Sequence, residues 1–386
     1  MRLFHISDLH IGLKLVNMDL IEDQKYILEK IIGYAKEMQP DVVLIAGDLF
    51  DRAIPSAEAV ELFDAFVSRL IESLPDKGCV MAVSGNHDSS SRIDCYRNLL
   101  KHNGVYMIGK PPMEENERIE KVVLKDDFGK VNFYLLPFIK PSMVKQILGA
   151  DPEGRNFSYN ESVKQIVNRE DINEAERNVI VSHQFYLPYG ERPEDMERCD
   201  SEIVTVGNID QVSSSILEKF DYAALGHIHK AMQVGRKSIR YAGTPLACSV
   251  SEAGQEKSVV MVDLKEKDTE PEIKFLPLKP LRKVRKVEGT LEELRNMPSE
   301  DYVSVLLTDE VDLETVNMYS TLRNLFPNML EVRRQTERSA DYKMNVTSHK
   351  ILDSFELCCE FLPELEAEEK EILKDIINTV SEKGEN

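Results

Sequence analysis

Five short motifs in this chain carry side chains that could bind metal ions. They hold Asp, His and Asn but no thiolate: Asp8-Leu9-His10, Asp48 in Gly47-Asp48-Leu49-Phe50-Asp51-Arg52, Asn86-His87-Asp88, His183, and His227-Ile228-His229. A mixture of carboxylate, imidazole and amide oxygen suits Mn, Fe or Zn better than Ca or a soft metal. Two such ions about 3.5–4 Å apart can hold a phosphate and activate a water for in-line attack. The motifs together therefore predict a two-metal site that acts on phosphate esters.

The spacing of these residues indicates how they could share two ions. A carboxylate is needed to bridge two cations that lie so close together, and Asp48 is the candidate. Asp8 and His10 alternate along an extended segment, so both side chains can face one ion. His227 and His229 have the same spacing and could serve one ion each.

Residues 86–88 add the predicted catalytic groups. Asn86 supplies a neutral oxygen, which keeps the donors from over-neutralising the metal ions. His87 stands beside this ligand, and an imidazole beside a phosphate can stabilise charge or protonate the leaving oxygen. Asp88 is the second predicted catalytic residue, because a neighbouring carboxylate can orient an imidazole.

Each motif follows an apolar segment that predicts a buried strand. These strands are predicted at residues 2–7, 42–46, 79–83, 178–182 and 220–225, with helices at 19–37 and 56–74 between the first three. Continuous β-branched segments are typical of strands that are buried on both faces. Alternating strands and helices form a parallel sheet, and such sheets bind ligands at the carboxyl ends of their strands. All five motifs are predicted at these ends.

The remaining segments predict how the chain is divided. Further strands are expected at 105–109 and 119–136, one helix within 151–178, a long loop at 184–210, and antiparallel strands at 239–264 that complete the sheet. Pro277 and Pro280 mark a boundary. The predicted units are an α/β domain at 1–278, a small α+β domain at 279–337, a linker at 338–350, and helices with apolar faces at 351–386.

Composition limits the class of protein and its partners. The chain has 386 residues and a formal net charge of −20, which opposes non-specific binding to nucleic acid. A phosphodiester substrate must then be held by metal ions, by local basic patches or by a partner. The densest basic clusters are Arg282-Lys283-Val284-Arg285-Lys286 and Arg333-Arg334. No signal peptide, membrane span or paired Cys spacing is recognisable, so a cytoplasmic protein whose cysteines are packing thiols is expected.

The order, spacing and strand-end placement of the motifs resemble the calcineurin-like metallophosphoesterases across residues 1 to about 265. Within that superfamily the chain is similar to the SbcD family, the nuclease subunits of bacterial SbcC–SbcD complexes. Residues 2–12, the segment Gly226-His227-Ile228-His229, the later Gly243-Thr244-Pro245 and the small domain after residue 280 carry this resemblance. It implies an α/β fold, with a β-sandwich flanked by helices, a small α+β cap domain and C-terminal helices.

The resemblance also implies roles for the site residues. One ion would take Asp8, His10, Asp48 and His229, the second would take Asp48, Asn86, His183 and His227, and His87 would be catalytic. The ions would be two Mn per chain, with Mg, Fe or Zn as alternatives. In the position of Asp51, archaeal and eukaryotic counterparts carry a second active-site histidine. Asp51 is what bacterial members are expected to have, and its role is at most to support a ligand.

The resemblance implies a partner as well. SbcD-family chains work with an SbcC-type ATPase, as a homodimer within a heterotetramer, on double-stranded DNA ends and hairpins and in recombination. This chain has no G-x-x-x-x-G-K-[ST] loop, so dependence on ATP must come from the partner. The C-terminal helices would dock on the partner's coiled coil, and the small domain would meet DNA through Arg282, Lys283, Arg285 and Lys286. No membrane partner is expected.

Plainer interpretations stay open beside these. Taken alone, Asp48 could cap a turn and His183 could be a hydrogen-bonded core residue, and His5, His102 and His349 are interpreted as structural. The basic cluster could be a solvated strand face, and the C-terminal apolar face could pack on its own body or form a homodimer contact. The functional alternatives are another metallophosphoesterase, such as a phosphoprotein phosphatase or cyclic-nucleotide phosphodiesterase, or a non-catalytic scaffold on the same fold.

Overall fold

The computed structural model describes most of the two predicted domains. The described residues are 1–95, 97–151, 154–188, 199–200, 202, 210–309, 315–334, 358–359, 362, 369–374 and 377. The predicted linker at 338–350 lies outside them, as does most of the predicted helical segment at 351–386. None of the described helices is long and apolar enough to cross a membrane.

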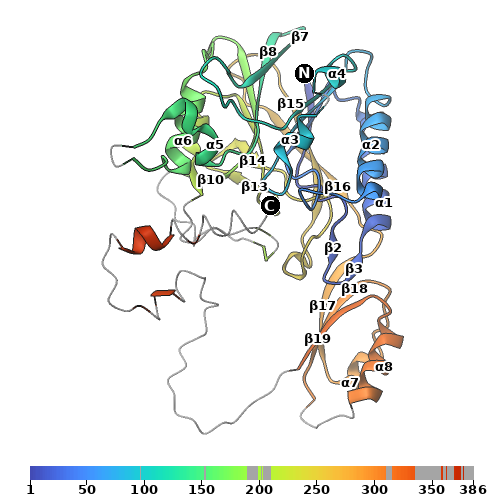
Figure 1. Cartoon of the computed structure of the whole chain (residues 1–386). Coiled ribbons are helices and arrows are strands. Elements are labelled where there is room, and N and C mark those ends of the chain that lie inside the picture. Colours follow the sequence, from blue (N-terminus) through green and yellow to red (C-terminus); the bar gives the residue numbers. More distant parts are fainter. Residues whose placement is uncertain are drawn as a thin grey trace.

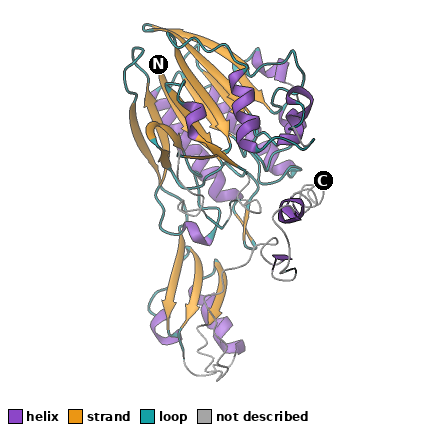
Figure 2. Ribbon diagram, turned by 90° about the vertical axis from the view of Figure 1, so that its left-hand side faces the viewer, coloured by secondary structure: helices purple, strands orange, loops and turns teal. Residues whose placement is uncertain are grey.

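Two six-stranded sheets form the body of the molecule (Figures 1 and 2). The first sheet has the order β16 (Glu272–Leu278), β15 (Lys257–Asp263), β1 (Arg2–Ile6), β4 (Val42–Ala46), β5 (Cys79–Val83) and β6 (Val105–Ile108). The second has the order β13 (Met232–Val234), β14 (Arg236–Tyr241), β12 (Tyr222–Gly226), β9 (Arg177–His183), β8 (Gly129–Leu136) and β7 (Glu120–Asp126). The predicted mixed α/β fold is confirmed.

The two sheets pack face to face, and helices cover both outer faces. One apolar core lies between the sheets and contains Leu44 of β4 and Val181 of β9. Helices α1 (Ile21–Met38) and α2 (Ala57–Ile71) share a core with the first sheet, and α5 (Pro141–Leu148) and α6 (Tyr159–Asn168) share one with the second. Every residue of β4 is buried because both of its faces are covered, which explains its uninterrupted apolar sequence.

The expectation of antiparallel strands at 239–264 is confirmed for β15, which pairs with β1 and β16, but the expectation that the segment completes one sheet is wrong. β14 runs parallel to β12 in the second sheet, whereas β15 runs antiparallel to β1 in the first. The chain therefore crosses from one sheet to the other within this segment. Short elements not placed by the sequence complete the domain: β2 (Lys14–Leu15), β3 (Met18–Asp19), α3 (Ser90–Ile93), α4 (Arg97–Lys101), β10 (Phe185–Leu187), β11 (Gln211–Ser213) and 3-10 helices at Ser214–Leu217 and Val250–Glu252.

A small unit follows β16 and stands at one end of the sandwich (Figure 1). Its three strands are all parallel, in the order β17 (Val284–Gly289), β18 (Tyr302–Leu307) and β19 (Met329–Arg334). Helices α7 (Leu291–Leu294) and α8 (Thr315–Leu325) pack with them around a separate apolar core. Thr290 and Glu293 form a capping box that begins α7.

Arg282 joins the small unit to the sandwich. Its guanidinium lies 2.6 Å from an oxygen of Asp23, a fully buried carboxylate near the start of α1, and 3.1 Å from Glu22. This ion pair with a buried carboxylate gives Arg282 a structural role, and its contact with nucleic acid stays a prediction. Lys283, Arg285 and Lys286 likewise remain predicted contacts.

Asp126, at the end of β7, gives a prediction about acid stability. Burial alone would raise the pKa of Asp126, but the Arg177 guanidinium and the amino group of Met1 lower it to about 2. The unfolded value is about 3.9, so the pair stabilises the fold above pH 4, and this contribution is lost as pH falls toward 2. Because solvent screens the partly exposed carboxylate, Asp126→Asn should cost about 1–2 kcal/mol at pH 7 and progressively less below pH 4.

Urea unfolding at pH 7, 4 and 3 measures this difference. Asp127→Asn is the matched control, because Asp127 is the exposed neighbour of Asp126. A difference between Asp126→Asn and wild type that stays constant over this pH range would contradict the assignment.

Candidate metal centre

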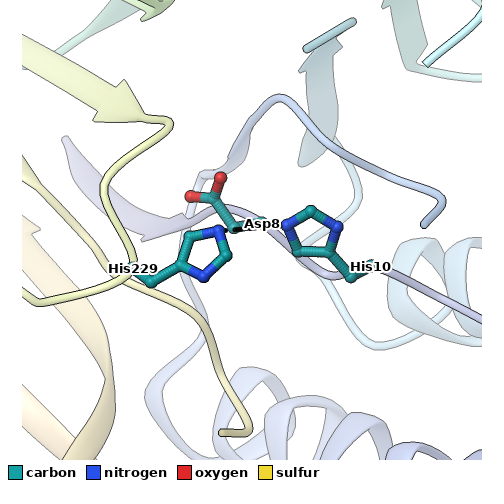
Figure 3. A group of neighbouring side chains, drawn as sticks. All are labelled: Asp8, His10 and His229. Carbon is teal, nitrogen blue, oxygen red and sulfur yellow. Dashed lines mark hydrogen bonds between the residues drawn. The ribbon is translucent and has the colours of Figure 1, made fainter. Parts of the chain in front are cut away.

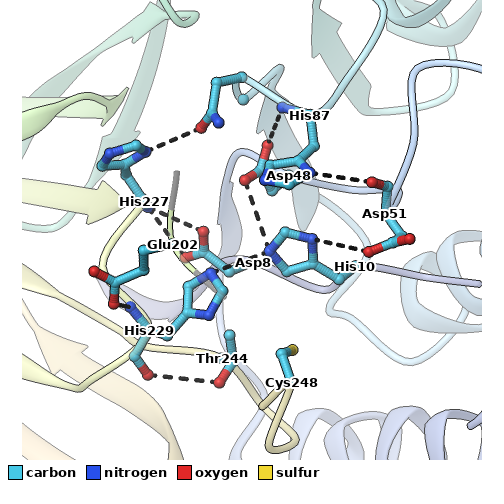
Figure 4. Close-up of polar contacts among 12 residues, drawn as sticks. Asp8, His10, Asp48, Asp51, His87, Glu202, His227, His229, Thr244 and Cys248 are labelled. Carbon is cyan, nitrogen blue, oxygen red and sulfur yellow. Dashed lines mark hydrogen bonds and ion pairs between the residues drawn. The ribbon is translucent and has the colours of Figure 1, made fainter. Parts of the chain in front are cut away.

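The five motifs meet where strands of the two sheets end, and Figure 4 labels side chains from each of them except His183. Asp8, Asp48 and Asn86 follow β1, β4 and β5 of the first sheet, His183 ends β9, and His227 follows β12 of the second. The charged donors are buried, with Asp8 and His183 both 0% exposed. Buried charges must be paired or bind a cation, so their convergence indicates a functional site.

The first donor set consists of Asp8, His10 and His229 (Figure 3). The Asp48 carboxylate lies beside this set. The Nε2 atoms of His10 and His229 lie 3.2 Å apart, and the His10 Nε2 lies 3.7 Å from the Asp48 carboxylate. Metal–nitrogen bonds of about 2.0–2.1 Å place two ligands of one ion about 3.0–3.4 Å apart, so these residues fit a divalent ion.

The second donor set consists of Asp48, Asn86, His183 and His227. The Asn86 Oδ1 lies 3.0 Å from the His183 Nε2 and 2.9 Å from the His227 Nδ1. The His183 Nδ1 donates to the Ala46 carbonyl at 2.7 Å, so in neutral His183 a lone pair on Nε2 faces the oxygens of Asn86 and Asp48. Acceptors that face one another need a cation between them, and this set therefore also fits a divalent ion.

Electrostatics at the site reflects this crowding of charge. Burial raises the pKa of Asp8 to about 6, against the opposing effect of His183 and His229. Burial would also raise the pKa of Asp48, but the neighbouring imidazoles, His183 first, hold it well below its usual range. Burial lowers the pKa of His183, yet the Asp48 carboxylate prevails and raises it to about 9.

Four proposed ligands have left-handed backbone conformations that non-glycine residues rarely adopt. The φ angles are 52° at Asp8, 41° at His10, 48° at Asp48 and 99° at His227. Such conformations cost of order 1–3 kcal/mol each and concentrate at functional sites. Backbone hydrogen bonds between the loop after β1 and the loop after β4 hold the first three of these residues. The Asp8 N–H donates to the Gly47 carbonyl at 3.0 Å, and the His10 N–H donates to the Asp48 carbonyl at 3.0 Å.

Gly85 is required by close packing at the site. A Cβ on Gly85 would lie 2.1 Å from the Asp48 Oδ1, and one on Gly47 would lie 2.2 Å from the His183 Nδ1. Real Cβ atoms do not approach other atoms so closely. The glycines that precede Asp48 and Asn86 therefore make room for another ligand.

His87 lies beside the first set, with its ring centroid 4.8 Å from that of His10. Its Nδ1 donates to the Asp51 carbonyl at 3.1 Å, and its backbone N–H donates to the Asp48 Oδ1 at 2.9 Å. The expectation that Asp88 orients this imidazole is corrected, because its carboxylate accepts from the N–H groups of Leu49, Phe50 and Gly85. Asp88 thus ties together the loops that carry Asp48 and Asn86.

Several supporting residues were missed by the sequence analysis. The Glu252 Oε1 lies 3.4 Å from the His229 Nδ1, and the Glu202 Oε1 accepts from the His229 N–H at 2.9 Å. Gln24 of α1 donates to the His10 carbonyl at 2.7 Å. No signal in the sequence marks these residues, because each lies on an element that is distant in sequence from the motif it supports.

Glu252→Gln should weaken metal binding at the first set by about 10–100-fold, because carboxylates that bond to metal-binding imidazoles have effects of this size. Glu252 is buried and paired with Lys257 at 2.6 Å, so its charge is held beside His229. Calorimetric titration with Mn²⁺ measures the change. Glu256→Gln is the control, since Glu256 is an exposed neighbour. Equal metal affinity in Glu252→Gln and wild type would contradict this role.

Comparison with known proteins assigns the class. The family model described as calcineurin-like phosphoesterase matches residues 1–231, which include all five motifs. The chain belongs to the calcineurin-like phosphoesterase family. This family binds two divalent metal ions, and the two donor sets are the candidate ligands in this chain.

Solved structures resemble the chain only distantly. GAP50, the anchor in the inner membrane complex of Plasmodium, is 12% identical, with 87% of this chain and 98% of that chain covered and a TM-score of 0.41. TT1561 of Thermus thermophilus is 12% identical, covering 72% of this chain and 99% of that chain, with a TM-score of 0.40. A dimetal phosphatase from Danio rerio gives the same four values. At these TM-scores the similarities add nothing to the family match.

Proposed function

We propose that the chain is a Mn-dependent DNA exonuclease and endonuclease of the SbcD type, which hydrolyses phosphodiester bonds by a two-metal mechanism. The observation that supports it most is that both donor sets are complete and share Asp48, with His87 held beside them. A non-catalytic scaffold would be expected to lose some of these donors. It would also gain nothing from the strained backbone conformations at four of the proposed ligands.

The chain's own residues divide the work of hydrolysis. Two divalent ions, when bound, supply Lewis-acid stabilisation of the phosphate and a water of lowered pKa. Asp48 holds the two donor sets together, because its carboxylate borders both. The His87 Nδ1–H is fixed on the Asp51 carbonyl, so a second proton on the ring would lie on Nε2, from which the imidazolium could protonate the leaving oxygen or donate a hydrogen bond to a phosphate oxygen.

DNA and an SbcC-type ATPase are the proposed partners, with the chain acting as a homodimer within a heterotetramer on DNA ends and hairpins and in recombination. Basic side chains on the small unit support contact with phosphates: Lys283 and Lys286 are exposed, and all three of Lys283, Arg285 and Lys286 line a cleft between the small unit and the sandwich. At a net charge of −20 the chain should bind DNA weakly alone, so the partner would supply much of the affinity.

Cleavage of an end-labelled linear duplex in Mn²⁺ tests the proposal, alone and with an SbcC-type ATPase and ATP. Release of nucleotides or of cut strands by wild type, but not by a variant that lacks the shared carboxylate, is expected. Hydrolysis of a phosphoprotein or a cyclic nucleotide at rates that DNA does not match, with the ATPase present, would overturn the nuclease assignment in favour of another metallophosphoesterase. Metal binding without any turnover would favour the scaffold.

A further inference from the structure

Two ligands of the first donor set, His10 and His229, are held by residues that border the small unit. The cleft between the small unit and the sandwich has a volume of about 930 Å³. Glu252 and Lys257 line one wall, and Arg282, Val284 and Tyr302 line the other. Residues next to or within these walls bond directly to the metal-binding segments.

The first connection runs through Gln24 of α1. Its side-chain amide donates to the carbonyls of His10 at 2.7 Å and Leu9 at 3.4 Å, and its oxygen accepts from the Gly12 N–H at 3.0 Å. One buried side chain therefore fixes the backbone on both sides of the His10 imidazole. The strained φ of His10 depends on such external support.

Asp23, the preceding residue, faces the small unit. Its carboxylate accepts from the Arg282 guanidinium at 2.6 Å, the Arg282 backbone N–H at 3.2 Å and the Tyr302 hydroxyl at 2.8 Å. Successive residues of a helix point about 100° apart, so Asp23 and Gln24 can hold different partners from one turn of α1. A shift of the small unit would move this turn and, with it, the loop of His10.

The second connection reaches His229. Its Nδ1 faces Glu252 at 3.4 Å, and its carbonyl accepts from the Lys257 ammonium at 3.2 Å. Glu252 lies on the 3-10 helix Val250–Glu252, which packs against β17 of the small unit. The two routes are independent in sequence and end on the two imidazoles whose Nε2 atoms lie 3.2 Å apart.

The second donor set is anchored differently. The His183 Nδ1 bonds to Ala46 of β4, inside the sandwich, and its Nε2 faces Asn86. Within the residues that the structure describes, no hydrogen bond or ion pair joins His183 or Asn86 to the small unit. The first donor set is therefore supported by residues that border the small unit, whereas the second is supported from within the sandwich.

We propose that the small unit is a positioning element for the first metal site, with Asp23, Gln24, Glu252 and Lys257 as positioning residues. It sets the affinity of the Asp8–His10–His229 set and leaves that of the second set unchanged. This role goes beyond the proposed nuclease function and does not depend on DNA being the substrate.

Calorimetric titration of the metal-free full chain with Mn²⁺ tests the proposal. Gln24→Met keeps the size of the side chain but removes its bonds, and one of the two Mn²⁺ affinities should weaken about tenfold while the other stays within about twofold. The spin-coupled electron paramagnetic resonance signal of the ion pair should appear only at higher Mn²⁺. In a His229→Ala background, which retains the second set, Gln24→Met should leave the remaining Mn²⁺ affinity unchanged.

Asp23→Asn and Arg282→Lys test the Asp23–Arg282 contact between the sandwich and the small unit, and they leave residues 8–12 unchanged. Asp23→Asn should weaken the same single affinity, and Arg282→Lys, which keeps a cation beside Asp23, should restore most of it relative to Arg282→Ala. Glu29→Gln is the matched control, since Glu29 lies further along α1 and forms an exposed ion pair with Arg69 of α2. If Gln24→Met does not fold, these variants decide. Equal weakening of both affinities, or no change in either, would overturn the proposal.

Discussion

Asp48→Asn should abolish hydrolysis of a simple phosphodiester, with a loss of at least about 1000-fold. Asp48 is the carboxylate that borders both donor sets, 3.7 Å from the His10 Nε2 and 3.2 Å from the His183 Nε2. A neutral amide cannot offset the repulsion between two divalent ions, and metal ions contribute several kcal/mol of transition-state stabilisation, at about 1.4 kcal/mol per tenfold. Steady-state turnover and Mn²⁺ titration measure the loss, and both affinities should weaken.

Asp51→Asn is the matched control for this variant. The Asp51 carboxylate lies 4.0 Å from the His10 Nδ1 and belongs to neither donor set, and its contact with His87 is made by the backbone carbonyl. Its loss should reduce turnover less than about tenfold, as for groups that only support a ligand. If the Asp48→Asn variant still binds both ions, or retains one-tenth of the wild-type turnover, the carboxylate does not bridge the two donor sets.

The strands that are buried on both faces could be predicted well, because this burial requires a continuous apolar segment in the sequence. The strands β4 and β5 are buried on both faces, so their sequences are continuous apolar runs that admit few other interpretations. The pairing of β14 with β12 and of β15 with β1 could not be predicted in the same way. β15 is largely apolar and β14 is largely polar, yet neither pattern specifies a sheet, because the sheet that each strand joins depends on the route of the chain.

The types of the metal-binding residues were predictable because chemistry limits them, but their support was not. Asp and His at strand ends bring the donors to one edge of the molecule, as the structure confirms for Asp8, His10 and His229. Glu252 and Gln24 reach the same site from distant elements through hydrogen bonds that no spacing encodes. For Asp88, adjacency to His87 suggested the wrong partner, since its carboxylate turns toward backbone N–H groups.

His87→Ala should lower kcat by about 10²–10⁴-fold, the usual contribution of a general acid or base. His87 lies close enough to His10 and Asp48 to form a further candidate group with them, but neither of the two proposed donor sets includes it, so both Mn²⁺ affinities should stay within a factor of about three. A loss of turnover without a loss of Mn²⁺ affinity distinguishes a catalytic residue from a metal ligand, because removal of a ligand would lower both. Parallel assays on duplex DNA and on a simple phosphodiester, with Mn²⁺ titration of each variant, measure it.

His87→Gln provides the control for His87, because an amide can still bond a phosphate oxygen but cannot donate a proton at neutral pH. If the imidazole acts as the acid, His87→Gln should be as slow as His87→Ala on a substrate with a poor leaving group, and both should recover on an activated ester that needs no protonation. If it acts only as a hydrogen-bond donor, His87→Gln should retain much of the rate on both. Loss of Mn²⁺ binding in His87→Ala would make His87 a ligand and contradict both roles.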